Sequence, residues 1–412
     1  MRRSRARLVI VGNGMAGARL GDELARVAPD RFAITVVGAE RQAAYNRIML
    51  SSVLAGDVAA DQIRLPSHAD VHQRLGETVV SIDRTAKRLH TLGDTIAYDT
   101  LVLATGSRPI ALPIPGASLP NVLTFRDLAD VDAMLAAPRG ARAVVIGGGL
   151  LGLEAAEGLR RRGLDVTVVH LMAWLMERQL DRRAGALLQE ELAARGIRFV
   201  LSAETAAILG RDRVTGVQLK DNRVLPADLV VMAVGIWPDT ALARAAHLEC
   251  GRGVVVDDAM RTSDPAIHAI GECCEHRGQC HGLVAPIWEQ VTACALALVG
   301  ERARFAPGPV ATSLKVSDVA VYSAGELAAG AGAEEIVLDN GAHGAYRKLV
   351  LRDGKLAGAV LFGDAGDGPW FFELMRAGRD IRAMRGDLIF GPAFAPPAPQ
   401  PGFVSDLVEA AA

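Results

Sequence analysis

Two glycine-rich stretches have the residue types and spacing of a dinucleotide-binding turn. The first, Gly12-Asn-Gly14-Met-Ala-Gly17, follows a β-branched run at 7–11 and precedes a helix-like pattern. Its glycines would allow a tight turn, close approach of the backbone to a pyrophosphate, and close packing of helix on strand. The positive end of the helix would then hold the phosphate charge. A lone fingerprint of this kind is weak, because such spacings also arise by chance.

A second copy of the pattern, Gly147-Gly-Gly149-Leu-Leu-Gly152, lies 135 residues further along the chain. The two stretches also match at Arg7 and Arg142, which open the preceding strands. An internal repeat favours two structural units of one type over coincidence. The sequence therefore predicts either two dinucleotides, or one dinucleotide and one inactive copy.

Strand and helix patterns surround both turns. In the first unit a strand at 32–38 ends just before Glu40, which lies 23 residues beyond Gly17. That is close to the spacing of about 20 residues at which a carboxylate meets a ribose hydroxyl. The alternative is a solvated loop acid. In the second unit the corresponding strand at 164–169 ends at His170 instead.

The predicted fold class is α/β, with two Rossmann-like dinucleotide-binding domains and a small C-terminal α+β domain. Prolines and glycines at 109–120 mark the first boundary. Short strands at 313–316, 347–352 and 356–362, followed by a helix at 370–379, indicate the small domain. The expected divisions are a discontinuous first domain (1–113 and 252–312), a second domain (114–251), the C-terminal domain (313–392) and a Pro-rich tail (393–412).

Composition excludes several function classes. The 412 residues are half hydrophobic and carry a net charge of −2, so neither nucleic acid nor an anionic membrane is expected as a partner. No apolar run approaches the roughly 18 residues of a membrane span, and the N-terminus lacks the apolar segment of a signal peptide. We expect a cytoplasmic protein. Its five cysteines (Cys250, Cys273, Cys274, Cys280, Cys294) lack metal-site spacing, which predicts reduced packing thiols and no metal.

Five motifs in order resemble the FAD/NAD-linked two-dinucleotide oxidoreductases, a family with the glutathione-reductase-like fold. They are the two fingerprints, Ala104-Thr105-Gly106, Ala233-Val-Gly235 and Ile270-Gly271-Glu272. A narrower resemblance is to the flavin module of NAD(P)H nitrite reductase large subunits and of assimilatory nitrate reductase electron-transfer subunits. It is carried by the stretches 44–56, 166–172, 175–181, 270–278, 282–290 and 364–370.

The resemblance implies that FAD binds the first unit. Arg47 would pair with an FAD phosphate or be a solvated arginine, and Glu272 would accept from a ribityl hydroxyl or act like a helix N-cap. Trp288 would line the isoalloxazine or be a core aromatic. The implied FAD-binding residues are Gly12, Gly14, Met15, Ala16, Gly17, Glu40, Arg47, Val80, Ala104, Thr105, Gly106, Gly271, Glu272 and Trp288.

The second unit would then bind NADH or NADPH. Glu154 resembles a carboxylate that approaches the nicotinamide amide, with a solvated helix acid as the alternative. The acid that would favour NADH is missing after the second strand, where His170 and Arg178 could approach a 2′-phosphate. Relatives with the same Val-Val-His-Leu-Met stretch tip the expectation towards NADH. The implied coenzyme-binding residues are Gly147, Gly149, Leu151, Gly152, Glu154, His170 and Gly235.

We nominate no catalytic side chain. Hydride transfer from nicotinamide to flavin needs stacking and exclusion of water more than an acid or base. Three departures from the family pattern matter. The cysteine pair of disulfide reductases is absent, Ser52 stands where ferredoxin and rubredoxin reductases usually place a lysine, and Trp237 replaces an arginine. The missing cysteine near residue 51 also disfavours a peroxide-forming or CoA-linked oxidase.

The predicted function is an FAD-dependent NAD(P)H oxidoreductase that passes electrons to a redox partner in nitrite or nitrate assimilation. The partner would be an iron–sulfur or sirohaem/molybdenum protein. Because cysteine-rich iron–sulfur and sirohaem segments are absent, this chain is not expected to reduce nitrite itself. The alternatives are a ferredoxin or rubredoxin reductase of another pathway, and a non-catalytic flavin-binding subunit.

Overall fold

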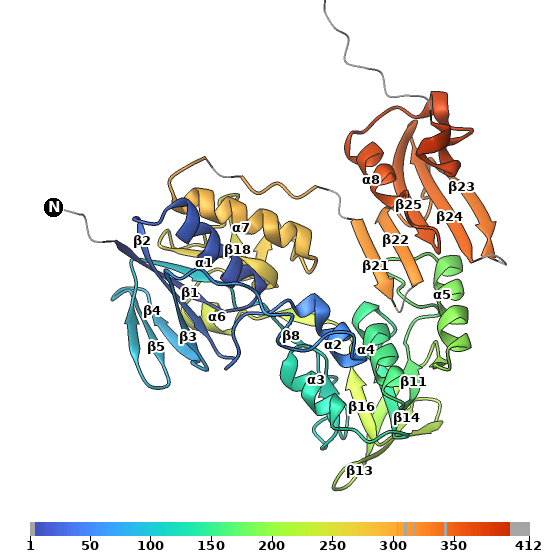
Figure 1. Ribbon diagram of the computed structural model, residues 1–412, viewed down its shortest axis with the longest axis horizontal. Helices are drawn as coiled ribbons and strands as arrows, with labels where there is room; N and C mark the ends of the chain where they lie inside the picture. The colour runs from blue at the N-terminus through green and yellow to red at the C-terminus, as the bar shows by residue number, and fades with distance from the viewer. Residues whose placement is uncertain (1–4, 303, 309–310, 317–318, 342–343, 396–412) are drawn as a thin grey trace, which may run out of the picture. The chain divides into compact units, whose positions relative to one another are not determined.

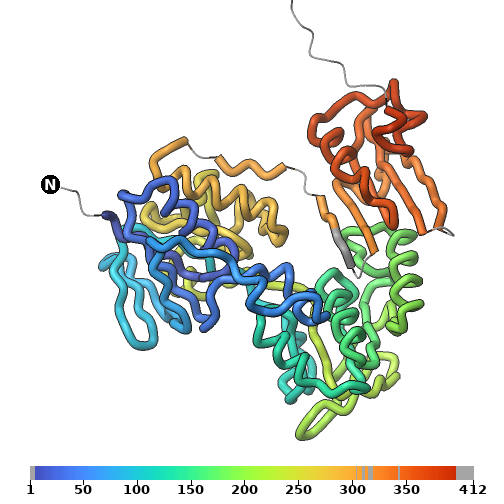
Figure 2. Tube along the Cα trace, viewed as in Figure 1, coloured from blue at the N-terminus to red at the C-terminus, as the bar shows by residue number. Residues whose placement is uncertain are grey.

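The computed structural model describes residues 5–302, 304–308, 311–316, 319–341 and 344–395, without the side chains of 314–316 (Figures 1 and 2). The chain divides into two compact units, Met1–Arg178 with Leu188–Val310, and Gln179–Leu187 with Ala311–Ala412. Most of the predicted Pro-rich tail lies outside the described residues. Among the described helices, none combines the length and the apolar character that crossing a membrane requires.

A parallel five-stranded sheet organises the first part of the larger unit, in the order β19-β7-β1-β2-β3. Helices α1 (Met15–Val27) and α7 (Val284–Leu298) pack against each other and share the hydrophobic core of this sheet (Figure 1). Leu20 and Leu24 of α1 are fully buried. The strands are β1 (Ala6–Val11), β2 (Phe32–Gly38), β3 (Val71–Leu75), β7 (Thr100–Leu103) and β19 (Ile267–Ala269).

A second parallel five-stranded sheet, in the order β12-β11-β10-β16-β9, repeats this arrangement. Helix α4 (Leu150–Arg161) follows its central strand as α1 follows β1. The strands are β9 (Val122–Thr124), β10 (Arg142–Ile146), β11 (Asp165–Val169), β12 (Arg198–Val200) and β16 (Leu229–Met232). Three further helices are α3 (Leu128–Leu135), α5 (Arg182–Ala194) and α6 (Ala241–Ala245). Residues 182–187 of α5 belong to the smaller unit, and Ala243 of α6 is buried in the core of the first sheet.

The internal repeat extends to a pair of matching ion pairs. Arg7 donates its backbone N–H, Nε and Nη2 to Asp99 at 2.7–3.1 Å. Arg142 donates the same three groups to Asp228 at 2.7–3.0 Å. The hydrogen bonds from each arginine hold the pKa of Asp99 and of Asp228 at about 2. The arginines that match in the sequence therefore tie the central strand of each sheet to its neighbour.

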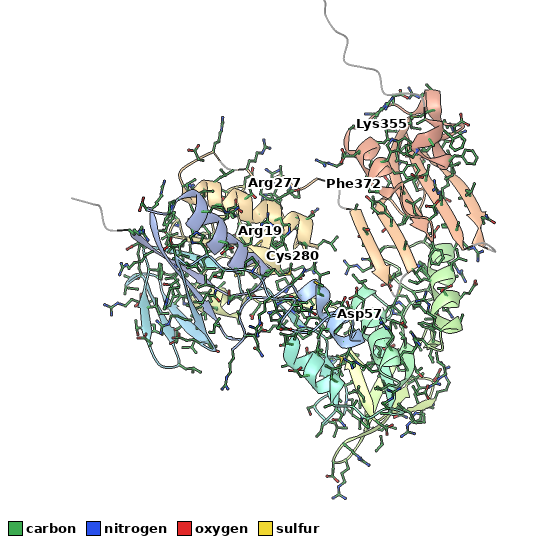
Figure 3. The ribbon with its side chains drawn as sticks, in the orientation of Figure 1. Arg19, Asp57, Arg277, Cys280, Lys355 and Phe372 are labelled. Carbon is green, nitrogen blue, oxygen red and sulfur yellow. The ribbon has the colours of Figure 1, made fainter. Side chains whose placement is uncertain are left out.

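Helix α2 (Leu50–Ala55) is fixed against α4. A Cβ atom on Gly158 would lie 2.8 Å from Leu54 Cγ, so the two helices pack closely there. Arg162 donates from Nε to Leu54 O at 2.9 Å. Asp57, labelled in Figure 3, accepts hydrogen bonds from Arg161 at 2.8 and 2.5 Å. Steric fit and two arginines thus hold a segment of the first half on the main helix of the second.

Small sheets complete the larger unit. Strand β8 (Ser107–Pro109) pairs antiparallel with β17 (Ile236–Pro238), and β18 (Val254–Val256) pairs parallel with β20 (Cys274–His276). Short 3₁₀ helices occur at η1 (Arg47–Met49) and η2 (Gly271–Cys273). Two three-stranded sheets comprise β4 (Val79–Asp83), β5 (Arg88–Thr91) and β6 (Thr95–Ala97), and β13 (Thr205–Gly210), β14 (Val214–Leu219) and β15 (Val224–Pro226).

The smaller unit contains an antiparallel five-stranded sheet in the order β21-β22-β25-β24-β23. Helix α8 (Gly368–Arg376) packs on it through Phe371 and Leu374, and the turns η4 (Arg382–Met384), η5 (Leu388–Phe390) and η6 (Pro392–Phe394) follow. The predicted helix at 370–379 thus starts and ends earlier. The strands are β21 (Ala311–Val316), β22 (Val319–Gly325), β23 (Ala333–Asn340), β24 (Ala345–Arg352) and β25 (Lys355–Phe362).

Candidate functional site

The first glycine turn links β1 to α1 in a conformation that only glycine allows. Gly12 has φ +113°, and a Cβ atom there would lie 2.1 Å from Ala104 O. A Cβ atom on Gly17 would lie 2.0 Å from Gly12 O. These clashes leave no room for a side chain. Met15 and Ala16 open α1, and Ala16 lies against Gly271, where a Cβ would be 3.3 Å from it.

Gly14 differs from its neighbours because it faces open space. Its φ of −84° suits any residue, and the nearest atom to a Cβ there would be Arg47 Nε at 4.0 Å. No side chain caps the described start of α1 by a hydrogen bond, so the first N–H groups of the helix remain available to a ligand. An anionic pyrophosphate of FAD fits these features.

Glu40 lies at the end of β2, held by two donors. Tyr45 donates its hydroxyl to Glu40 at 2.7 Å, and Arg47 forms an ion pair with the same carboxylate. Arg47 also donates from Nη1 to the carbonyl of Arg126 at 3.0 Å. The Glu40 side chain is 36% exposed, so it can still accept from a ribose hydroxyl. The structure thus brings Gly14, Glu40 and Arg47 together.

Glu272, just after β19, is a second carboxylate that is held by donors. Its Oε2 accepts from Ser107 Oγ at 2.8 Å and from Arg126 Nη2 at 2.5 Å. The preceding Gly271 has φ +84°, and its N–H donates to the buried side chain of Gln290 at 2.8 Å. Sequence reasoning missed Arg126, which carries no motif and reaches Glu272 from 146 residues away.

The two Ala-x-Gly turns meet each other. Thr105 donates its hydroxyl to Asp239 O at 2.8 Å, and the N–H of Asp239 donates to Gly106 O at 2.9 Å. Ile110 N–H donates to Gly235 O at 2.9 Å. The segments that follow β7 and β16 are therefore joined by hydrogen bonds.

The other predicted FAD residues lie on separate elements. Val80 is on β4 and its side chain is 48% exposed. Trp288 is half-buried on α7, with the guanidinium of Arg19 (labelled in Figure 3) 4.5 Å above its ring centre. These two placements alone do not connect Val80 or Trp288 with the glycine turn.

The second glycine turn reproduces the first. Gly147 has φ +122°, and a Cβ atom there would lie 2.3 Å from Ala233 O. A Cβ atom on Gly152 would lie 2.0 Å from Gly147 O. Gly149 has φ −82°, and apart from its chain neighbours no described heavy atom lies within 4 Å of its Cβ position. Leu151, in the first turn of α4, is 41% exposed. This turn also fits a dinucleotide.

His170 is buried and uses both ring nitrogens. Nδ1 accepts the N–H of Gly148 at 3.0 Å, and Nε2 lies 3.0 Å from Glu177 Oε2. The residue is 7% exposed, so it offers no accessible nitrogen to a 2′-phosphate. Arg178 is exposed. The sequence analysis did not single out Glu177. The signal that could have indicated it is an acidic residue in the loop that follows β11.

Glu154 lies on α4 and forms a hydrogen bond with Ser51 of α2. Burial raises the pKa of Glu154 to about 7, and the hydrogen bond with Ser51 opposes part of that rise. Because burial dominates this shift, the carboxyl is largely protonated just below neutral pH. It is therefore available as a hydrogen-bond donor at this junction of α2 and α4.

Glu154 makes stability depend on pH in a definite direction. Its pKa is about 7 in the folded protein, against an ordinary value of 4.5 for a glutamate, so stability falls as pH rises through that interval and levels off above it. We expect Glu154→Gln to gain thermal stability relative to the native protein between pH 5 and pH 8, by at most about 3 kcal/mol. Melting curves at several pH values would check this. A difference that stays constant with pH, like that of the exposed Glu301→Gln control, would contradict it.

The cysteines lie in packing positions. Cys273 donates its thiol to Ile270 O and Cys274 to Gly271 O, each at 3.2 Å. Burial raises the pKa of both thiols. All five cysteines are unpaired. A disulfide mechanism therefore has no support from these residues.

Comparison with known proteins supports a flavin- and nicotinamide-dependent reductase. Residues 6–295 match the family described as pyridine nucleotide-disulphide oxidoreductase. Residues 309–379 match the rubredoxin NAD+ reductase C-terminal domain. Both matches confirm the predicted fold class.

The chain is 47% identical over 382 residues to a nitrite reductase [NAD(P)H] of Bacillus subtilis, covering 91% of this chain and 48% of that protein. It is 41% identical to the assimilatory nitrate reductase electron transfer subunit of the same organism, covering 93% and 51%. The chain thus spans about half the length of these relatives. A solved ferredoxin reductase for the CYP199A2 system from Rhodopseudomonas palustris superposes with TM-score 0.84 and 28% identity, covering 95% and 98%.

These likenesses confirm the predicted class, an FAD-dependent NAD(P)H oxidoreductase, and with it the cofactors FAD and NADH or NADPH. The family match covers both glycine turns and the strands and helices that follow them. The chain therefore belongs to the pyridine nucleotide-disulphide oxidoreductase family.

Proposed function

We propose that this chain carries electrons from NADH or NADPH through FAD to a partner protein in nitrite or nitrate assimilation. The observation that carries this proposal is the pair of glycine turns. In each turn the first and third glycines have no space for a side chain, whereas the second glycine, Gly14 or Gly149, has open space at its Cβ position. Two usable dinucleotide sites suit a protein that hands electrons from one bound dinucleotide to another.

We assign FAD to the first turn and its sheet (1–113 and 252–312), and the nicotinamide coenzyme to the second (114–251). The paired carboxylates Glu40 and Glu272 support this order, because each stands ready to accept from a hydroxyl of FAD. Arg47 and Arg126 lie beside them as cations for the diphosphate. When bound, FAD supplies the redox chemistry, taking two electrons as a hydride and releasing them to an acceptor.

The chain's own residues would orient and shield the reacting parts. The fixed contact of α2 with α4 brings Ser51 and Glu154 together, at the junction of the two proposed sites. Below about pH 7, Glu154 would donate a hydrogen bond to a carboxamide oxygen, such as that of nicotinamide. No side chain is assigned as a nucleophile.

Anaerobic mixing tests the proposal directly. The flavin-loaded protein would be mixed with NADH and, separately, with NADPH, while flavin absorbance near 450 nm is followed. We expect rapid bleaching by at least one coenzyme. If neither coenzyme bleaches the flavin, the reductase proposal fails and a non-catalytic flavin-binding subunit replaces it.

We propose that the acceptor is an iron–sulfur or sirohaem/molybdenum redox protein, as the sequence resemblance implies. The names of the two Bacillus relatives support a place in nitrite or nitrate reduction. A second candidate is a ferredoxin or rubredoxin reductase of another pathway, which the C-terminal match at 309–379 favours. Adding a nitrite reductase, a ferredoxin and a rubredoxin in turn to the reduced protein would separate these acceptors. The cytoplasmic location remains a prediction.

A further inference from the structure

The loop after β11 holds a carboxylate beside the second glycine turn. His170 Nδ1 accepts the N–H of Gly148, and an accepting imidazole nitrogen carries no proton. The ring proton therefore lies on Nε2 and is donated to Glu177 Oε2, 3.0 Å away. A continuous chain of hydrogen bonds thus runs from the glycine turn through a buried ring to Glu177, whose side chain is 24% exposed.

The backbone fixes the same loop a second time. Met176 N–H donates to Gly148 O at 3.0 Å, and Met176 adopts φ +55°. A Cβ atom on Gly148 would lie 2.7 Å from the His170 ring and 2.8 Å from Leu175. Both backbone polar groups of Gly148 are therefore bound by this loop, which sets Glu177 in a defined place near the turn.

The register of the two repeats shows which residue of the second unit stands in the position of Glu40. Gly12 donates to Val37 O and Gly147 to Val169 O, both at 2.8 Å. Three residues beyond those carbonyls stand Glu40 in the first unit and Met172 in the second. Met172 is 41% exposed but cannot accept a hydrogen bond from a ribose as a carboxylate does. Glu177, five residues later, brings a carboxylate back to this edge.

We propose that Glu177 binds the adenosine ribose of the nicotinamide coenzyme and so selects NADH over NADPH. This rests on the proposed function. A carboxylate accepts hydrogen bonds from ribose hydroxyls, whereas it repels a 2′-phosphate. His170 is a positioning residue, because it orients Glu177 and is itself covered. Arg178, exposed beside Glu177, is the competing group, since a guanidinium would favour the 2′-phosphate.

Calorimetric titration of the flavin-loaded protein with ADP-ribose and with 2′-phospho-ADP-ribose tests the proposal without turnover. The native protein should bind ADP-ribose at least about tenfold more tightly. Glu177→Gln should weaken ADP-ribose about tenfold and leave the 2′-phosphate analogue unchanged or tighter. His170→Asn, which keeps an acceptor for Gly148 but cannot reach Glu177, should lose part of the discrimination. Glu301→Gln, which removes an exposed charge elsewhere, should change neither.

Three results would overturn the proposal. In the first, Glu177→Gln weakens the binding of both ligands equally. In the second, the native protein prefers the 2′-phosphate analogue and loses that preference in Arg178→Gln. In the third, neither ligand binds. The proposed function is judged separately by flavin bleaching. If Glu177 discriminates between the two ligands and no coenzyme reduces the flavin, the assignment of Glu177 stands and the proposed function fails.

Discussion

A Gly149→Val protein is expected to fold, keep its yellow flavin and lose reduction by NADH and NADPH. Gly149 has an ordinary φ of −82°, and no described atom lies within 4 Å of its Cβ position. The substitution therefore disturbs no described packing. It fills the space through which a pyrophosphate would approach α4. We expect anaerobic flavin bleaching to slow at least about 100-fold, equivalent to a loss of roughly 3 kcal/mol.

Two companion variants make this result interpretable. Gly149→Ala should give a smaller loss, because one methyl group intrudes less than three carbons. Gly93→Ala, at another glycine with no described atom within 4 Å of its Cβ position, should behave like the native protein. Dithionite should still bleach all of these proteins. Normal bleaching of Gly149→Val by NADH would show that the second turn does not hold the coenzyme.

The matching change in the first turn should instead weaken the binding of FAD. Gly14 has φ −84°, and among the described residues, its chain neighbours aside, the nearest atom to its Cβ position is Arg47 Nε at 4.0 Å. Gly14→Val should therefore fold but bind FAD at least about 100-fold more weakly, and purify nearly colourless. Absorbance at 450 nm per chain, together with circular dichroism to verify folding, would measure this.

The pair of variants also tests which turn holds which dinucleotide. If Gly14→Val remained yellow while Gly149→Val became colourless, the two assignments would have to be exchanged. Gly12 and Gly17 are unsuitable for this purpose. A side chain there would collide with backbone at 2.1 and 2.0 Å, so loss of flavin could result from misfolding alone.

Local patterns in the sequence were sufficient to predict the two glycine turns and the strands that precede them. Glycines with positive φ or no space for a Cβ are dictated by neighbouring atoms, so their spacing carries the geometry. Gly12 and Gly147 illustrate this, each facing the carbonyl of an Ala-x-Gly turn. The fold class and the two glycine turns could therefore be predicted.

Partners distant in the sequence could not be predicted. Arg126 reaches Glu272 across 146 residues, and only tertiary packing brings them together. Glu177 depends on a buried histidine tautomer, which no local pattern encodes. Strand β23 was missed because four of its eight residues are charged or amide side chains, and most of the strand is exposed, which hides the alternation of a half-buried strand.

The duplicated Arg–Asp ties have a consequence for how this protein can diverge. Both halves have the parts that hold each sheet together, Arg7 with Asp99 and Arg142 with Asp228. They differ at the position three residues after Val37 and Val169, where one half has Glu40 and the other Met172. The residues that hold each sheet together are thus separate from those proposed to contact the ligand. Ligand preference can accordingly evolve, or be engineered, in one half while the framework shared by both stays intact.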